Sequence, residues 1–217
     1  MNMLKRNMLC LVIGGFFLAG CQMSVPIGIN QSKLIKPTSP PNIQLTMLSE
    51  AKDARTGYDK NQVGRHTWSL LMFPGFRVRT PQDLEVEIAE RTIETLTSIG
   101  YEVKTVDKLN ESQDPVVVIQ VDTLRNLLFA WIYPLGLTWG HMKLSVHLMS
   151  PDGYTLWETH LDQASGMGAS FLYMCGFKSR VKKDFTKNLN QIIEVLSSEE
   201  FVQKLKKAQI DKTASSY

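Results

Sequence analysis

The sequence has few of the residues that catalytic and metal sites most often need. Four histidines and three cysteines occur among 217 residues, and no H-E-x-x-H, G-x-S-x-G, P-loop or dinucleotide-binding motif is present. Metal and acid–base chemistry need such groups to converge on one point. We therefore predict a protein that is not an enzyme and that binds no metal or cofactor.

The chain also lacks an apolar run that would serve as a permanent membrane helix, since crossing a bilayer takes roughly 20 apolar residues. The run Leu9–Leu18 has signal-peptide length, follows Lys5 and Arg6, and leads into Leu18-Ala19-Gly20-Cys21. That tetrapeptide is similar to the lipobox, at which signal peptidase II cuts before a cysteine that receives lipid. We predict a signal peptide at 1–20 and lipid, including palmitate, on Cys21; the alternative is an uncleaved anchor.

The sequence around Cys21 also predicts a location. Several acyl chains on one residue would hold the protein to a membrane, since each buried methylene contributes about 0.8 kcal/mol. Gln22 stands where an Asp would favour the inner membrane in enteric-type lipoproteins. This predicts the periplasmic face of the outer membrane of a Gram-negative bacterium. Without 1–20 the charges nearly balance, which argues against nucleic acid as a partner.

Composition divides the mature chain. Residues 21–41 are rich in proline and small polar residues, which predicts a lipidated tether. We expect a periplasmic domain at 42–210 and a loose tail at 211–217. Cys175 is the one thiol left after cleavage and lipidation, so no intramolecular disulfide can form, and we expect it to be buried.

Hydrophobic periodicity predicts an α+β domain, a two-layer sandwich of a mainly antiparallel sheet with helices packed on one face. A helix is expected from Thr80, with Pro81 at its first position, to Gly100. The other expected elements are strands at 43–48, 68–73, 101–105 and 117–121, a hairpin of 143–149 with 154–162, and helices at 179–196 and from Ser198.

The hairpin register can be worked out from its Asp152-Gly153 turn. Pairing Pro151 with Tyr154 places Leu148 opposite Trp157, so one face is mainly apolar. The same register places His147 opposite Glu158 and His160 opposite Ser145. No two imidazoles face each other across the turn, so we predict no histidine metal site.

Two almost wholly apolar segments, 127–137 and 166–176, join expected elements where a polar connection is usual. Their prolines and glycines favour loops over continued strands or helix. Exposed apolar loops mark contact surfaces, and aromatic side chains are suited to them. We predict a partner-binding surface at Phe129, Trp131, Tyr133 and Trp139. The alternative is that the loops fold over the open face of the sheet.

Two charged patterns are ambiguous. Asp53 and Arg55 lie on an expected polar loop, where a structural ion pair is favoured over a ligand site. A basic run would meet anionic lipid or cell-wall polymer if it faced the envelope, although a solvated helix face is favoured. That run consists of Lys178, Arg180, Lys182, Lys183 and Lys187.

Several of these motifs together resemble the YajG-like family of small Gram-negative lipoproteins. They are the lipobox, Asp53-x-Arg55 followed by Val63-Gly64, the helix ending in Gly100-Tyr101-x-Val103, and Asp152-Gly153 before an apolar strand. The resemblance implies an envelope protein without established catalysis.

From these observations we expect an outer-membrane lipoprotein with an accessory or scaffold role. Its non-catalytic periplasmic domain would bind an envelope protein or a second copy of itself. Two alternatives stay open. One is a lipid-handling accessory of an envelope transport or lipopolysaccharide-assembly machine, and the other is an activator of cell-wall synthesis.

Overall fold

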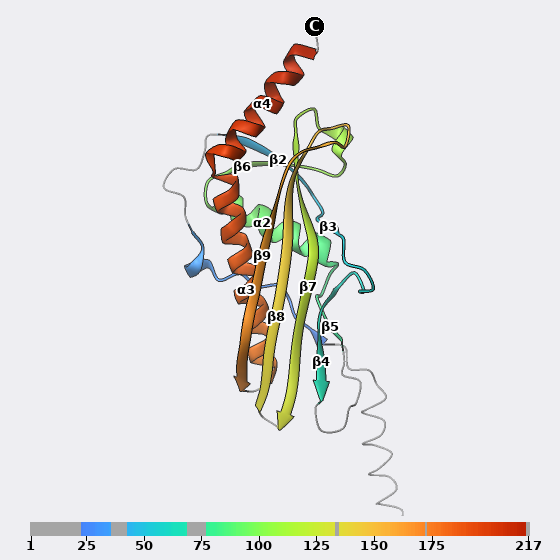
Figure 1. Cartoon of the computed structure of the whole chain (residues 1–217), viewed down its shortest axis with the longest axis vertical. Helices are drawn as coiled ribbons and strands as arrows, with labels where there is room; N and C mark the ends of the chain where they lie inside the picture. Colours follow the sequence, from blue (N-terminus) through green and yellow to red (C-terminus); the bar gives the residue numbers. More distant parts are fainter. Residues whose placement is uncertain (1–22, 36–42, 69–76, 133–134, 172, 216–217) are drawn as a thin grey trace, which may run out of the picture.

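The structure is a computed structural model that describes residues 23–35, 43–68, 77–132, 135–171 and 173–215 (Figure 1). Within these residues one mixed sheet is covered on one side by helices, which confirms the α+β class. The strands are β1 (Met23–Ser24), β2 (Gln44–Leu48), β3 (Lys52–Asp53), β4 (Gln62–Trp68), β5 (Arg77–Arg79), β6 (Glu102–Val106), β7 (Val116–Ile132), β8 (Leu135–Met149) and β9 (Thr155–Phe171). The helices are α2 (Leu84–Ser98), α3 (Tyr173–Leu196) and α4 (Glu199–Ser215), with short 3₁₀ turns η1 (Gln31–Lys33) and η2 (Leu109–Glu111).

Strand β7 is the centre of the sheet. Along one edge it pairs antiparallel with β8, from Val116 to Ile132. Its other edge pairs parallel with β2, then β3, then β4 along successive stretches. Antiparallel pairing joins β7 to β8, β8 to β9 and β4 to β5, so most of the pairing is antiparallel as expected, although the sheet as a whole is mixed. The parallel pairing of β2 with β6 arises because the crossover through α2 returns the chain as β6 beside β2.

The predicted hairpin register is confirmed. Leu148 pairs with Trp157, and His147 pairs with Glu158. The turn differs by one residue, because the Ser150 N–H donates to the Tyr154 carbonyl at 2.8 Å and a register shift follows Leu148. The connection therefore holds three residues, and Gly153 takes the positive φ of +89° that such a turn requires.

Both ends of the expected helix at Thr80–Gly100 can be compared with α2. The C-terminal end is confirmed, since Gly100 has φ +102° and the Tyr101 N–H donates to the Leu96 carbonyl at 3.0 Å. The start is wrong, because α2 begins only at Leu84. The Thr80 hydroxyl donates to the Gln82 carbonyl at 2.6 Å and so stabilises a turn ahead of the helix.

The two apolar segments expected as loops are mostly regular structure. β7 continues to Ile132, β8 begins at Leu135, and β9 continues to Phe171. Helix α3 begins at Tyr173, well before the predicted Ser179. Ladder pairing outweighs the local signals, and the sheet accommodates its glycines at register shifts such as the one between Thr138 and Gly140.

Other boundaries also differ from expectation. β4 covers 62–68, so Gln62 to Gly64 belong to a strand rather than to the polar loop. Only Trp68 of the strand predicted at 68–73 is described, and it ends β4. α4 continues to Ser215, so residues 211–215 are helical rather than part of a loose tail.

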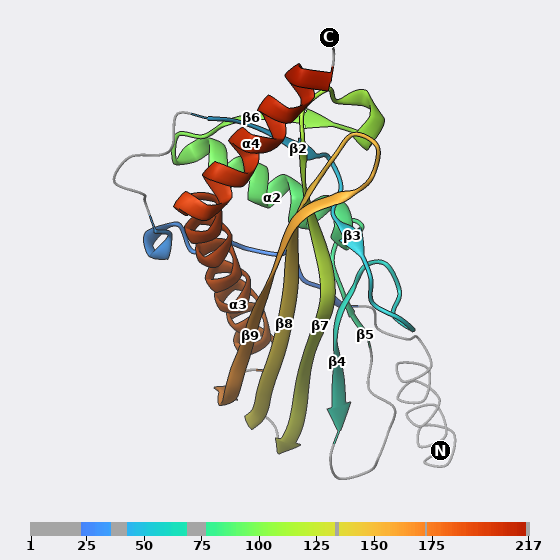
Figure 2. The ribbon, with the colours of Figure 1, turned by 45° about the horizontal axis from the view of Figure 1, so that its top comes forward.

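The main core lies between the sheet and the helices. α3 contributes Phe177, Val181, Phe185 and Leu189, all at most 1 % exposed, along one stripe. Fully burying a side chain of this size contributes roughly 1.5–3 kcal/mol. In Figures 1 and 2 α2 and α3 lie on the same side of the sheet. A smaller cluster, formed by Val106, Val116, Val118 and Met149, packs together elsewhere on the sheet.

Residues 23–35, which we call the N-terminal strap, belong to the domain. Val25 and Ile27 are buried in the main core, at 2 % and 0 % exposure. The Ile27 N–H donates to Glu87 Oε1 at 2.6 Å, and the Asn30 N–H donates to Thr186 Oγ1 at 2.9 Å. The prediction of a tether at 21–41 is therefore wrong for this part. Its composition excludes long helices or strands, but side-chain acceptors satisfy its backbone donors instead.

Glu87 gives the strap a pH-dependent contact. Burial raises the pKa of Glu87 from 4.5, and the hydrogen bond from Ile27 only partly opposes this. An acid whose folded pKa is raised binds more protons in the native state, so stability falls as pH rises from 4.5 through the folded pKa. Glu87→Gln keeps an acceptor for Ile27 and removes the buried charge. We expect a higher melting temperature than wild type at neutral pH, with little difference near pH 4.5.

Thermal unfolding followed by circular dichroism across that pH range measures this difference. Glu87→Ala is the control, because it removes the acceptor and leaves the Ile27 N–H buried without a partner, at a cost of about 1–3 kcal/mol. A Glu87→Gln variant that is equally less stable than wild type at both pH values would contradict the assignment.

Candidate functional site

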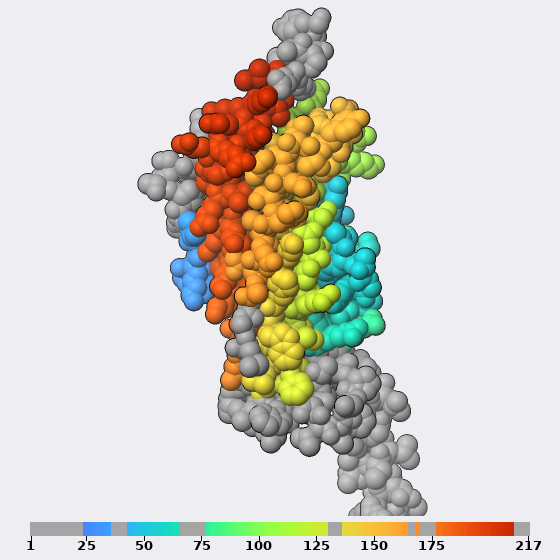
Figure 3. Space-filling view, viewed as in Figure 1, coloured from blue at the N-terminus to red at the C-terminus, as the bar shows by residue number. Residues whose placement is uncertain are grey.

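The candidate site lies on the outer face of the β7–β8–β9 meander, the face away from the helices. Leu124, Asn126 and Leu128 of β7 are almost fully buried, at 1 %, 2 % and 0 % exposure, and face the core. Leu127 and Phe129 alternate with them and therefore lie on the outer face. Figure 3 looks onto this face, and none of the described helices crosses the part of it formed by β8.

Four half-buried apolar side chains gather on this face. Leu127 pairs with Trp139 and Phe129 pairs with Leu137 across the β7–β8 ladder. Side chains opposite each other in this way lie about 4.5–5.5 Å apart at their Cβ atoms. We call these four residues the apolar patch.

The structure thus places two of the four predicted partner-binding residues, Phe129 and Trp139, on one surface. The side chain of Trp131 and the whole of Tyr133 lie outside the described residues, so their roles stay predictions, as does lipid on Cys21. The other two members of the patch, Leu127 and Leu137, were missed by the sequence analysis. Their period-two alternation with buried residues was the available signal.

Two arginines lie beside the apolar patch. Arg65 of β4 pairs with Leu127, and Arg125 of β7 pairs with His141 on β8. Both arginine side chains are exposed. The patch therefore has an apolar centre with cationic groups on two sides, which suits a surface that carries carboxylates at its rim.

Histidines and carboxylates follow the outer face toward the hairpin turn. His141 Nε2 lies 2.7 Å from Asp162 Oδ1, and His147 Nδ1 lies 3.4 Å from Glu158 Oε2. Burial lowers the pKa of His147, against the opposing charge of Glu158. Within the part of the chain that the structure describes, no group of three His, Cys, Asp or Glu side chains is arranged to hold a metal ion.

Ser145 is the polar centre of this row. Its hydroxyl contacts His160 Nδ1 at 2.6 Å and also hydrogen-bonds Asp122. In a Ser–His–Asp triad the carboxylate binds and orients the imidazole. Here the carboxylate binds the serine, and a hydroxyl has a single proton to donate. The contacts here run Asp–Ser–His, whereas those of a catalytic triad run Asp–His–Ser.

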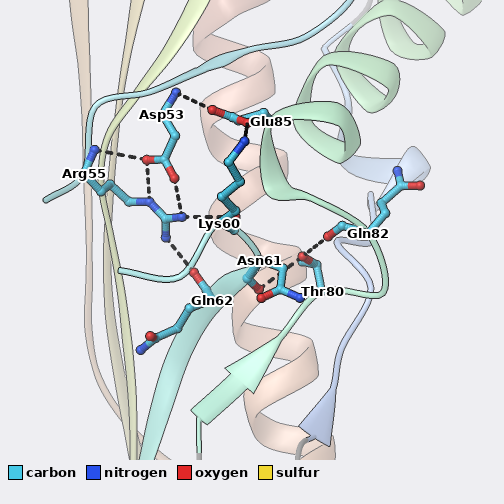
Figure 4. A network of polar contacts seen from close by, with 8 residues as sticks. All are labelled: Asp53, Arg55, Lys60, Asn61, Gln62, Thr80, Gln82 and Glu85. Carbon is cyan, nitrogen blue, oxygen red and sulfur yellow. Dashed lines mark hydrogen bonds and ion pairs between the residues drawn. The ribbon is translucent and has the colours of Figure 1, made fainter. Parts of the chain in front are cut away.

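Asp53 and Arg55 form a structural network that joins three parts of the chain (Figure 4). Arg55 Nε and Nη2 donate to the two carboxylate oxygens of Asp53 at 2.8 and 2.7 Å, and Nη1 donates to the Gln62 carbonyl at 2.6 Å. The Asp53 N–H donates to Glu85 on α2 at 3.3 Å. Only 1 % of the Arg55 side chain is exposed. Its donors are occupied by the protein itself, which supports the structural interpretation over a ligand site.

An open cleft of about 470 Å³ borders this network. Its lining includes Glu50, Lys52, Glu85, Asp107 and Gln120. Such a charged and open surface does not suit an acyl chain, which would need an apolar enclosure.

Comparisons with known proteins support the fold. No protein-family model and no curated protein matches the sequence. A crystal structure from Xanthomonas campestris, of family DUF330, matches with a TM-score of 0.51 and 11% identity, over 82% of this chain and 94% of that chain. A homolog of neuraminyllactose-binding hemagglutinin from Helicobacter pylori matches with a TM-score of 0.49 and 11% identity, over 80% and 96%.

At this identity the Xanthomonas structure shows a shared fold alone. The resemblance to the YajG-like family and the location in a Gram-negative envelope stay predictions. Among the described residues no helix is both long and apolar enough to cross a membrane.

The Asp53–Arg55 pair yields a stability prediction. Burial would raise the pKa of Asp53, but the hydrogen bonds and charge of Arg55 outweigh it and hold that pKa below 3.8. Removing one partner of a buried ion pair costs about 3–5 kcal/mol. We expect Arg55→Met to lower the free energy of unfolding at neutral pH by that amount, as measured by urea denaturation.

The pH dependence provides the check on this prediction. Because the folded pKa of Asp53 is lowered, its contribution is present above 3.8 and is lost as pH falls through the folded pKa. The deficit of Arg55→Met should therefore shrink in acid. A deficit under 1 kcal/mol at neutral pH, within the usual range for surface ion pairs, would contradict a buried structural role.

Proposed function

We propose that this protein is a lipid-anchored accessory or scaffold protein of the cell envelope, attached to the outer membrane through Cys21, whose non-catalytic periplasmic domain binds a protein partner through the apolar patch. The observation that carries the proposal is the set of four half-buried apolar side chains on a sheet face that none of the described helices covers. Clustered apolar side chains on an uncovered surface mark interaction sites.

The patch has the properties of a protein-binding surface. Phe129 is paired with both β4 and β8, and Trp139 is paired with β7 beside the register shift of the β8–β9 ladder, so both residues lie on strands inside the sheet. Fixed aromatic side chains bury a large area at little entropic cost, and they supply a large share of binding energy in known interfaces.

The flanking charges favour a different protein over a second copy of this chain. In a two-fold dimer formed through the patch, each patch would face its own copy. The rim of such an interface would then contain Arg65 and Arg125 from both copies, which concentrates like charges on one surface. A partner that presents apolar side chains with carboxylates around them matches the patch better.

A lipid-handling role has less support from the described residues. It would need an apolar groove between helix and sheet, and that space is filled by side chains such as Phe177, Phe185 and Phe201, each at most 1 % exposed. The described cleft lies elsewhere and is lined by charges. Activation of cell-wall synthesis would be one instance of partner binding, with the identity of the partner decided by experiment.

Partner capture tests the patch directly. Trp139→Ala should weaken capture of the partner from detergent-solubilised envelopes by about 30-fold, which corresponds to a 2 kcal/mol interface residue. The matched control is Tyr154→Ala, because Tyr154 is an aromatic residue that is 73 % exposed at the far turn of the β8–β9 hairpin. Quantitative mass spectrometry of the captured proteins measures both effects.

The control should capture the same protein as wild type does. Equal capture by wild type, Trp139→Ala and Tyr154→Ala would show that the patch is not part of the interface. A melting temperature of Trp139→Ala far below that of wild type would show that Trp139 serves stability rather than binding.

A further inference from the structure

Cations are concentrated at one end of the molecule. At the end where β4 finishes and α3 begins, five side chains are exposed or half-buried: Arg77, Arg79, Lys178, Lys182 and Lys183. We call these residues the basic end. The described carboxylates in this region are Asp59, which binds Arg77 and Arg79 at 2.6 and 2.5 Å, and Asp184, which is 1 % exposed.

The rest of the described chain is richer in acid than in base. Most carboxylates lie on α2, around the charged cleft, along β9, or on the far side near η2 and α4. Helix α3 itself has no acidic residue in its first turn, although the helix dipole would favour one there. The lysines that follow are therefore not explained by helix stability.

The N-terminal strap begins at this same end. Met23 pairs with Val78 of β5, and Val78 pairs with Gly64 of β4. Gly64 lies against α3, since a Cβ at that position would be 2.6 Å from Phe177 Cζ. Phe177 directly precedes Lys178. Because neighbouring strands lie about 4.8 Å apart, Met23 is about 10 Å from Gly64.

The predicted lipid attachment therefore lies close to the basic end. Cys21 is two residues before Met23, and two extended residues span at most about 7 Å. The start of the strap is fixed to the sheet, because the Val25 N–H donates to the Arg79 carbonyl at 2.7 Å. Further along the strap, Gly28 lies beside the Lys182 side chain, with a Cβ there 3.4 Å from Lys182 Cδ.

We propose that the basic end lies directly against an anionic phospholipid surface, so that the domain is oriented on the membrane rather than suspended from a tether. This proposal rests on the lipid anchor of the proposed function. Charges act on a membrane only within about a Debye length, roughly 8 Å in physiological salt. A flexible tether of twenty residues would leave the lysines far from the membrane most of the time, whereas a link of two residues keeps this end of the domain beside it.

This orientation deepens the proposed function. The long strands run away from the basic end, and the outer face of the meander with its apolar patch forms a side of the molecule (Figures 1 and 3). The patch lies near the membrane end of that side, since Leu127 pairs with Arg65, and Arg65 pairs with Arg77 of the basic end. A protein partner would therefore bind the patch close to the membrane surface.

Vesicle binding of a chain without lipid tests the proposal. The chain from residue 21 with Cys21→Ser keeps every described residue. We expect it to cosediment with vesicles of phosphatidylethanolamine and phosphatidylglycerol, to dissociate as salt is raised, and not to bind phosphatidylcholine vesicles. Lys178→Glu with Lys183→Glu should weaken binding by at least about 25-fold, since each basic residue near such a surface contributes about fivefold.

A charge-matched control separates position from net charge. Lys204→Glu with Lys206→Glu changes two exposed lysines of α4, at the opposite end of the molecule, by the same number of charges. This pair should change vesicle binding by no more than about twofold. No binding of the parent chain, or equal losses for both pairs, would overturn the proposal. So would a loss of protein capture in the α3 pair with vesicle binding unchanged.

Failure of the anchor is distinguished by a different measurement. In cells, the full chain should fractionate with outer membranes and Cys21→Ser should not. If Cys21→Ser is released from membranes but the vesicle assay shows no binding, the lipid anchor is supported and the proposed contact of the basic end with the membrane is wrong. If wild type carries no lipid, the proposed function fails whatever the vesicle result.

Discussion

The structure depends on the pairing of β7 along both of its edges. Its buried stretch of valine and isoleucine is stable only when β8 covers one edge and β2, β3 and β4 together cover the other. Because α2 and α3 pack on one side of the resulting sheet, most of the outer side of β7, β8 and β9 has no helical cover. The row of His–carboxylate contacts and the apolar patch both occupy this side, which makes it the surface available for binding.

The N-terminal strap relates this sheet to the envelope. Ile27 occupies the core and its N–H binds Glu87, so the chain between the predicted lipid and the domain is as short as two residues. A lipoprotein with a long tether samples many orientations, whereas a short link restricts the domain to a few. In the proposed orientation the basic end faces an anionic surface, and the proposed partner site lies at a fixed distance from the membrane. The proposed anchor, orientation and binding surface are thus linked through the packing of the strap.

Local patterns in the sequence predicted the β8–β9 register, because alternation and the Asp152-Gly153 turn act over a few residues. They predicted the end of α2 at Gly100 for the same reason.

Parallel pairing of β2 with β6 and β7 depends on contacts far apart in sequence, which composition does not reveal. Pro26 and Gly28 indicated a linker because only local propensity was considered, yet Val25 and Ile27 find a core formed by α2 and α3. Glycines at 136 and 168 indicated loops, although ladder pairing on both sides of β8 outweighs them. Phe129 and Trp139 were predicted because aromatic residues in an apolar stretch stand out, while their pairing with leucines required the register.

The central claim is that the strap is part of the fold. Amide hydrogen exchange of the chain from residue 21 measures this most directly, with amides of β7 such as that of Val118 as the internal reference. The account predicts that the amides of Ile27 and Asn30, which donate to Glu87 and Thr186 at 2.6 and 2.9 Å, exchange far more slowly than those of an unstructured peptide. Exchange of both amides at the rate of an unstructured chain, while Val118 stays protected, would show a loose tether and would contradict the account.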